Sequence, residues 1–190
     1  MSVFNIYLIG VGGQGIGLLS NILIRSIDRS GQKVIGVDTH GLAQRGGTVQ
    51  SMVRVGEVFS ALIPEGEAHL VVALEKNEAL RGLTTFLRPG GTLVYYDTEW
   101  QPLATRMSGK TTQIKEGIAA NGALLKAREI AVHIPELPDT RMQNMALLAT
   151  IAHEGLVPGV TVEHFVQTIE ETVPKKLLSH NLALFHQITR

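Results

Sequence analysis

The residues best suited to chemistry lie in one short segment, His40-Gly41-Leu42-Ala43-Gln44-Arg45-Gly46-Gly47. Arg45 carries a planar guanidinium whose fork of N–H donors fits a carboxylate or a phosphate, and Gln44 adds an amide beside it. Glycines on both sides, including Gly46 and Gly47, permit positive φ and close approach of the backbone to a ligand. Two interpretations of Arg45 stay open, namely anion recognition at a shared active site and an ion pair at a subunit contact.

His40 opens this segment and could exchange a proton near neutral pH, where the imidazole ordinarily titrates. A hydrogen-bonded structural role is the alternative for a lone histidine in a loop. The other histidines do not form a zinc pattern. His153 lacks a second histidine four residues on, and His180 and His186 are too far apart for an i, i+4 chelate. We therefore expect no metal site in this chain.

A second glycine-rich segment follows the first apolar run of the chain. Gly10, Gly12 and Gly15 have the G-x-G-x-x-G spacing of a dinucleotide site. Free N–H groups at the start of the following helix could hold an anion at Gly12, Gly13 and Gly15, with Gln14 donating an amide hydrogen bond. Alternatively, the glycines only permit a sharp turn and close helix packing, and Gln14 only caps the helix.

Asp38 ends a second apolar run, about twenty residues further on, where a dinucleotide site would hold a ribose hydroxyl. A crossover helix should then follow, because parallel neighbouring strands need a long connection. Instead the chain passes through the 40–47 loop directly into residues 48–55, whose alternation is typical of a strand. This order disfavours a nicotinamide cofactor and favours Asp38 as a turn former that bonds its own backbone.

The composition excludes several classes of partner. The 190 residues contain 17 Lys+Arg and 17 Asp+Glu, so the electrostatic footprint of a nucleic-acid or anionic-membrane binder is missing. Hydrophobic residues make up 44% of the chain, and the mean hydropathy of +0.15 suits a subunit with a covered face. No stretch approaches the roughly 18 uninterrupted apolar residues of a spanning helix. The first five residues lack a basic n-region, so we expect no signal peptide and a cytoplasmic protein.

The chain contains no cysteine. Iron–sulfur clusters are held mainly by cysteine thiolates, so this chain cannot build an ordinary cluster. If the protein takes part in low-potential electron transfer, a partner chain must carry the electrons. Disulfides are excluded as well, which agrees with a reducing compartment.

The hydrophobic pattern predicts one α/β domain over residues 1–190, with an open, mostly parallel Rossmann-like sheet, an inserted β-hairpin and a helical C-terminal half. The first helix should begin between residues 12 and 17 and end near residue 29. We expect the hairpin at residues 48–55 and 58–63. The other strands should lie at residues 3–9, 33–37, 70–74 and 92–96, with a further candidate at 111–115. The other helices should lie at residues 77–87, 121–131, 140–153, 162–172 and 174–188.

Three motifs in this order resemble the gamma subunit of 2-oxoacid:ferredoxin oxidoreductases. The first is the Gly-x-Gly-Gly-Gln-Gly opening at residues 10–15, and the second is His-Gly-x-x-Gln-Arg-Gly-Gly at 40–47 running into Ser-x-Val-Arg-x-Gly at 51–56. The sequence of the second motif is most similar to that of the small (beta) subunit of the indolepyruvate type. The third is Pro174-Lys175-Lys176 followed by Asn181-Leu182-Ala183-Leu184-Phe185. The resemblance covers nearly the whole chain except residues 100–140, where no functional residue is assigned.

The resemblance implies a subunit that works only in a complex. Larger partner chains would carry thiamine diphosphate and iron–sulfur clusters, and this chain alone would bind no cofactor. The complex would oxidatively decarboxylate a 2-oxoacid, such as indolepyruvate or another aryl pyruvate, to an acyl-coenzyme A and reduce ferredoxin. Coenzyme A would be the co-substrate. Two alternatives remain open, namely a stand-alone NAD(P)-dependent oxidoreductase and a non-catalytic nucleotide-binding or assembly module.

Overall fold

A six-stranded sheet in the order β2-β3-β1-β4-β5-β6 forms the centre of the computed structural model, which describes residues 3–40, 47–99, 113–137, 139 and 142–190. β4 pairs in parallel with β1 and β5, β6 pairs in parallel with β5, and β3 runs antiparallel to both β1 and β2. The open, mostly parallel sheet that the sequence predicts is therefore confirmed. The strands are β1 (Phe4–Val11), β2 (Val34–His40), β3 (Thr48–Val55), β4 (Ala68–Ala73), β5 (Leu87–Tyr96) and β6 (Arg128–Val132).

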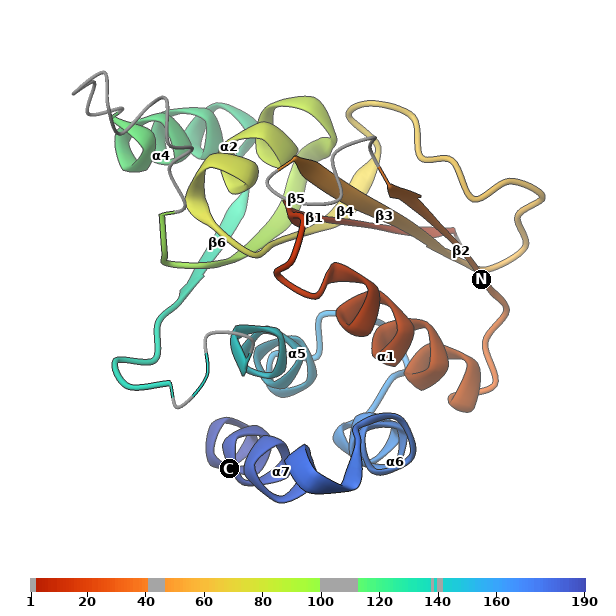
Figure 1. Cartoon of the computed structure of the whole chain (residues 1–190). Coiled ribbons are helices and arrows are strands. Elements are labelled where there is room, and N and C mark those ends of the chain that lie inside the picture. The colour runs from red at the N-terminus through yellow and green to blue at the C-terminus, as the bar shows by residue number, and fades with distance from the viewer. Residues whose placement is uncertain (1–2, 41–46, 100–112, 138, 140–141) are drawn as a thin grey trace.

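Helices cover both faces of the sheet, and two further helices form an outer layer on one side (Figure 1). One face carries α2 and α4, the other carries α1 and α5, and α6 and α7 lie behind α1 and α5. The central helix α5 is buried from Gln143 to Ala152, because it lies between the sheet and this outer layer. The helices are α1 (Ile16–Arg29), α2 (Lys76–Thr85), α4 (Ile114–Leu125), α5 (Gln143–His153), α6 (Val162–Thr172) and α7 (Lys175–Thr189).

The continuous apolar run of β1 follows from this layering. Ile6 and Leu8 pack in the core shared with α1 and α5, whereas Tyr7 and Ile9 pack in the core on the α2 face. All four side chains are buried. Apolar residues at every position stabilise a strand that is covered on both faces, so the strand shows no alternation of apolar and polar residues.

The hairpin predicted at residues 48–55 and 58–63 is wrong. β3 pairs with β2 instead, with Asp38 opposite Ser51, and residues 56–67 contain no strand. The Arg54 side chain holds the segment after β3 by donating hydrogen bonds to the carbonyl oxygens of Ser60 and Leu62. These carbonyls are therefore bonded by a side chain rather than by a neighbouring strand.

The predictions for residues 111–115 and 121–131 are confirmed only at residues 121–125, which are helical, and are wrong elsewhere in the part of this stretch that the structure describes. Ile114 and Lys115 belong to α4 rather than to a strand, and α4 ends at Leu125, followed by its C-cap Lys126, which has a φ of 51°. Residues 128–132 are not helical but form β6, the last strand of the sheet. Only Val132 of this strand is buried, so it lacks the apolar run that identifies a central strand from sequence.

The last three predicted helices are confirmed within a few residues as α5, α6 and α7. Pro174 lies at the start of α7, as its fixed φ favours. In the part of the chain that the structure describes, no helix combines the length and the apolar character needed to cross a bilayer.

Candidate functional site

Both glycine segments singled out in the sequence meet at one edge of the sheet. The N–H group of Gly12, after β1, donates a hydrogen bond of 2.8 Å to the carbonyl oxygen of Gly47, which precedes β3. β1 leads into α1 on one face, while its parallel neighbour β4 leads into α2 on the other face (Figure 1). Open α/β sheets bind ligands outside the carboxyl ends of strands at such a change of face. The predicted site residues that the structure describes therefore lie where a ligand is expected.

The loop before α1 requires glycine at specific positions. Gly13 has a φ of 101° and Gly15 a φ of 86°, a region that residues with a Cβ rarely adopt. A Cβ on Gly15 would also lie 2.5 Å from the amide nitrogen of Asn144. Gly15 is the N-cap of α1, and no described side chain caps this end. The geometry leaves backbone N–H groups at the positive end of a 14-residue helix, which suits an anion.

Gln14 closes this loop instead of capping the helix. Its side-chain oxygen accepts a hydrogen bond of 2.8 Å from the N–H group of Val11, and the residue is buried. The interpretation of Gln14 as a helix cap is wrong, because α1 has no side-chain cap. Only the NH2 half of the amide could serve a ligand.

Asn144 of α5 fixes the same loop from the other side and was not predicted. Its Nδ2 donates hydrogen bonds to the carbonyl oxygens of Gln14 (2.9 Å) and Gly15 (3.2 Å). The side chain is buried, and its Oδ1 has no hydrogen-bond partner among the described residues. About 130 residues separate the partners, so no local pattern could have identified this contact.

Asp38 does not end its strand or form a turn, so that prediction is wrong. It lies inside β2, and its carboxylate accepts a hydrogen bond of 3.0 Å from the hydroxyl of Ser20 in α1. β3 occupies the place beside β1 that the second strand of a dinucleotide-binding unit would take. The arrangement thus argues against a ribose-binding role for Asp38.

A group of buried polar side chains extends the site on the α2 face. Glu75, two residues after the end of β4, is the N-cap of α2 and accepts hydrogen bonds from the N–H groups of Asn77 (3.0 Å) and Glu78 (2.6 Å). The carboxylate of Glu78 accepts a hydrogen bond of 3.1 Å from the hydroxyl of Thr48 and forms an ion pair of 3.2 Å with Arg81. The spacing Glu-x-x-Glu after an apolar run was the available sequence signal for these two carboxylates.

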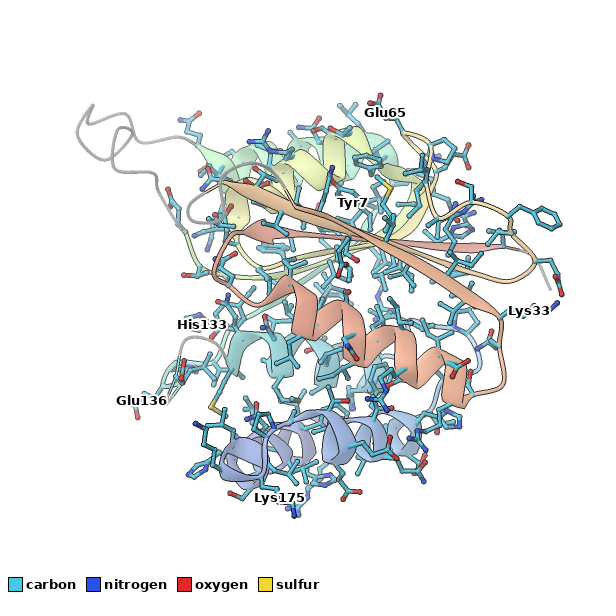
Figure 2. All side chains as sticks on the ribbon, turned by 45° about the vertical axis from the view of Figure 1, so that its right-hand side comes forward. Tyr7, Lys33, Glu65, His133, Glu136 and Lys175 are labelled. Atoms are coloured by element: carbon cyan, nitrogen blue, oxygen red, sulfur yellow. The ribbon has the colours of Figure 1, made fainter. Side chains whose placement is uncertain are left out.

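Burial shifts the titration of this group. Burial raises the pKa of the Glu78 carboxyl, and the neighbouring Glu75 raises it further, while Arg81 and the hydrogen bond from Thr48 oppose the shift. Burial and the charge of Glu78 also raise the pKa of the Tyr7 hydroxyl, which donates a hydrogen bond to Gln50. Tyr7 lies between the sheet and the helices of this face (Figure 2). The fold thus encloses two titratable groups beside the glycine segments.

Several predicted residues lie outside the described part of the chain, namely Gln44, Arg45, Gly46 and the side chain of His40. The backbone of His40 pairs opposite Val49 at the end of β2. Together with the Gly12–Gly47 hydrogen bond, this pairing fixes both ends of the segment that carries Arg45 at the candidate site.

Away from the two glycine segments, the described residues line a cavity but form no cluster of metal ligands. Among the described residues, no group of three or more His, Asp or Glu side chains could hold a metal ion. A cavity of about 470 Å³ lies between the loop after β6 and α7, and no described residue of either glycine segment lines it. Its lining consists of Ile134, Pro135, Glu136, Leu137, Met142, His180, Ala183, Leu184 and Gln187.

Comparison with known proteins decides the family. The family model for pyruvate ferredoxin/flavodoxin oxidoreductase matches residues 5–190. The chain belongs to this family. Among curated relatives of this family member, the indolepyruvate oxidoreductase subunit IorB of Archaeoglobus fulgidus is 37% identical, with 94% of this chain and 90% of the relative covered. The protein of the same name from Methanothermobacter thermautotrophicus is 33% identical, with 96% and 94% covered.

Solved structures share the fold of this family member. A keto/oxoacid ferredoxin oxidoreductase gamma subunit from Geobacter sulfurreducens superposes with a TM-score of 0.66 at 18% identity, covering 100% of this chain and 95% of the other. The pyruvate oxidoreductase subunit PORC of Thermotoga maritima gives 0.67 at 16% identity, with 100% and 96% covered. A 2-oxoglutarate:ferredoxin oxidoreductase from Magnetococcus marinus gives 0.67 at 18% identity, with 99% of this chain but 30% of the longer chain covered. The predicted family and fold class are confirmed.

Proposed function

We propose that this chain is the small subunit of a 2-oxoacid:ferredoxin oxidoreductase complex that acts on indolepyruvate or another aryl pyruvate. The observation that carries the proposal is the family match over residues 5–190. It is supported by the similarity to relatives named indolepyruvate oxidoreductase subunits, which extends over nearly their whole length. The complex oxidatively decarboxylates the 2-oxoacid, transfers the acyl group to coenzyme A and passes the electrons to ferredoxin.

The composition of the chain supports a division of labour in this complex. With no cysteine, the chain cannot supply the thiolates of an iron–sulfur cluster. Larger partner subunits hold the clusters and thiamine diphosphate, and this chain has no activity alone. The absence of cysteine also suits a reducing compartment, and we expect the complex to work in the cytoplasm.

The contribution of this chain is an anion-binding edge at an active site shared with its partner. Gly12, Gly13, Gln14 and Gly15 form one side of this edge, and Gln44, Arg45, Gly46 and Gly47 form the other. The Gly12–Gly47 hydrogen bond and the uncapped start of α1 support this arrangement. The anion is the carboxylate of the 2-oxoacid or a phosphate of coenzyme A, both of which suit an arginine fork. His40 could exchange a proton there.

The two alternatives have weaker support. A stand-alone NAD(P)-dependent oxidoreductase rests on the spacing of Gly10, Gly12 and Gly15, and the position of β3 between β2 and β1 opposes it. A non-catalytic assembly module rests on the lack of a complete catalytic set, which a subunit of a shared site also explains.

The proposal is tested by coexpressing the chain with its larger partner and assaying reduction of ferredoxin or a viologen dye. We expect activity that requires both an aryl pyruvate and coenzyme A, with pyruvate and 2-oxoglutarate as comparison substrates. A purified complex that reduces the acceptor without coenzyme A, or uses none of the 2-oxoacids, would contradict the proposed reaction.

A further inference from the structure

A continuous set of contacts leads from α2 to both glycine segments. Glu78 in the first turn of α2 holds the hydroxyl of Thr48 at 3.1 Å. Thr48 directly follows Gly47, whose carbonyl oxygen accepts the 2.8 Å hydrogen bond from Gly12. The Glu78 carboxylate is therefore hydrogen-bonded to the residue that directly follows Gly47, and Gly47 is the residue bonded to Gly12.

A buried glutamate at this position costs free energy that an amide or an apolar residue would not. Glu78 is 5% exposed, and burying an ionised carboxylate is unfavourable unless hydrogen bonds and charges compensate. Helix capping does not require it, because Glu75 already accepts the N–H groups of Asn77 and Glu78. Outside its own helix, Glu78 accepts a hydrogen bond from Thr48, on the strand that begins at the candidate site.

We propose that Glu78 is a positioning residue, which holds Thr48 and thereby keeps Gly47 bonded to Gly12, so that the start of β3 and the loop before α1 stay together at the candidate site. This inference rests on the proposed function for its effect on catalysis. The positioning of Gly47 by Glu78 and Thr48 can be tested on this chain alone, because all of these contacts lie within it. The hydrogen bond, rather than the negative charge, is what the position requires.

The first measurement follows amide hydrogen exchange of Gly12 in the isolated full-length chain. Glu78→Ala should accelerate this exchange about tenfold or more, because the Gly47 acceptor loses its support. Glu78→Gln should retain slow exchange, since its amide oxygen can still accept from Thr48. Thr48→Val should match Glu78→Ala, and the double variant should be no worse than either single one, as coupled partners require.

The second measurement is steady-state kinetics of the reconstituted complex. Glu78→Ala and Thr48→Val should lower kcat/KM about ten- to a hundredfold, as displacements of positioning groups do, while assembly in a pull-down is unchanged. Glu78→Gln should restore the kinetics. Glu116→Ala, an exposed glutamate in the first turn of α4, is the matched control and should leave both readouts at the wild-type level.

Two results would overturn the inference. One is unchanged Gly12 exchange in a folded Glu78→Ala variant, and the other is a Glu78→Gln variant as impaired as Glu78→Ala. If the wild-type complex shows no 2-oxoacid-dependent activity, the proposed function fails, and the exchange measurement still decides the role of Glu78.

Discussion

At the scale of single residues, the two carboxylates at the start of α2 have different partners. Glu75 uses its carboxylate on its own helix, whereas Glu78 is bonded to Thr48 on another element. Because burial raises the pKa of Glu78, the folded chain favours the protonated form of this group more than the unfolded chain does. The stability that Glu78 contributes is therefore fully present below the pKa of the unfolded carboxyl and is lost as the pH rises through the folded pKa.

Glu78→Gln should consequently stabilise the chain progressively more as the pH rises from acid towards neutral. The amide keeps an acceptor for Thr48 but carries no charge to bury. The measurement is the free energy of urea unfolding over a pH series for both chains, with the exposed Glu116→Gln as the control. A difference between variant and wild type that stays constant with pH, or shrinks, would contradict the sign derived from burial.

Arg45 carries the most specific prediction about the ligand. Arg45→Lys should be nearly as harmful as Arg45→Ala, since lysine keeps the charge but loses the bidentate fork. Hydrogen bonds to charged groups contribute roughly 1.5–3 kcal/mol, so the apparent affinity for the anion should fall about ten- to a hundredfold. Kinetics with the 2-oxoacid and coenzyme A varied separately would identify the anion. Unchanged KM and kcat would refute the contact, and loss of assembly would make Arg45 an interface residue.

At the scale of elements, sequence periodicity was sufficient where a helix buries one apolar face. Phe165 and Ile169 are buried, and the predicted range of α6 is the observed one. The pattern failed at β6, which buries little, and at residues 58–63, which Arg54 holds through backbone carbonyls. The glycine segments could be predicted because local spacing identifies them. Asn144 and the Thr48–Glu78 pair could not, because tertiary packing brings them together.

The loop between β1 and α1 gives a prediction that compares three glycines. Gly13→Ala should cost about 1–3 kcal/mol from strain at a φ of 101° alone, since a Cβ there meets nothing within 4 Å. Gly15→Ala should cost more, because its Cβ also meets Asn144 at 2.5 Å. Gly17→Ala, inside α1 with open space around it, should stabilise by about 0.5–1 kcal/mol. Urea unfolding gives the order, and equal effects at all three positions would contradict it.

In the whole molecule, the layered fold places the candidate site at one edge of the sheet, whereas most of the hydrophobic core lies between the sheet and the helices. α5 is enclosed by the sheet on one side and by α6 and α7 on the other, and its Asn144 also holds the loop before α1. At the edge with both glycine segments, α1 begins at Gly15 without a side-chain cap among the described residues, and the Gly12–Gly47 hydrogen bond joins β1 to β3.

The most direct test is titration of the purified chain into a fixed amount of its purified larger partner, with aryl pyruvate, coenzyme A and a viologen dye present. We expect the chain alone to be colourless and inactive, and the rate to rise with added chain until it saturates at a fixed ratio of subunits. Turnover by this chain alone with any nicotinamide cofactor, or a partner whose rate does not change when the chain is added, would contradict this expectation.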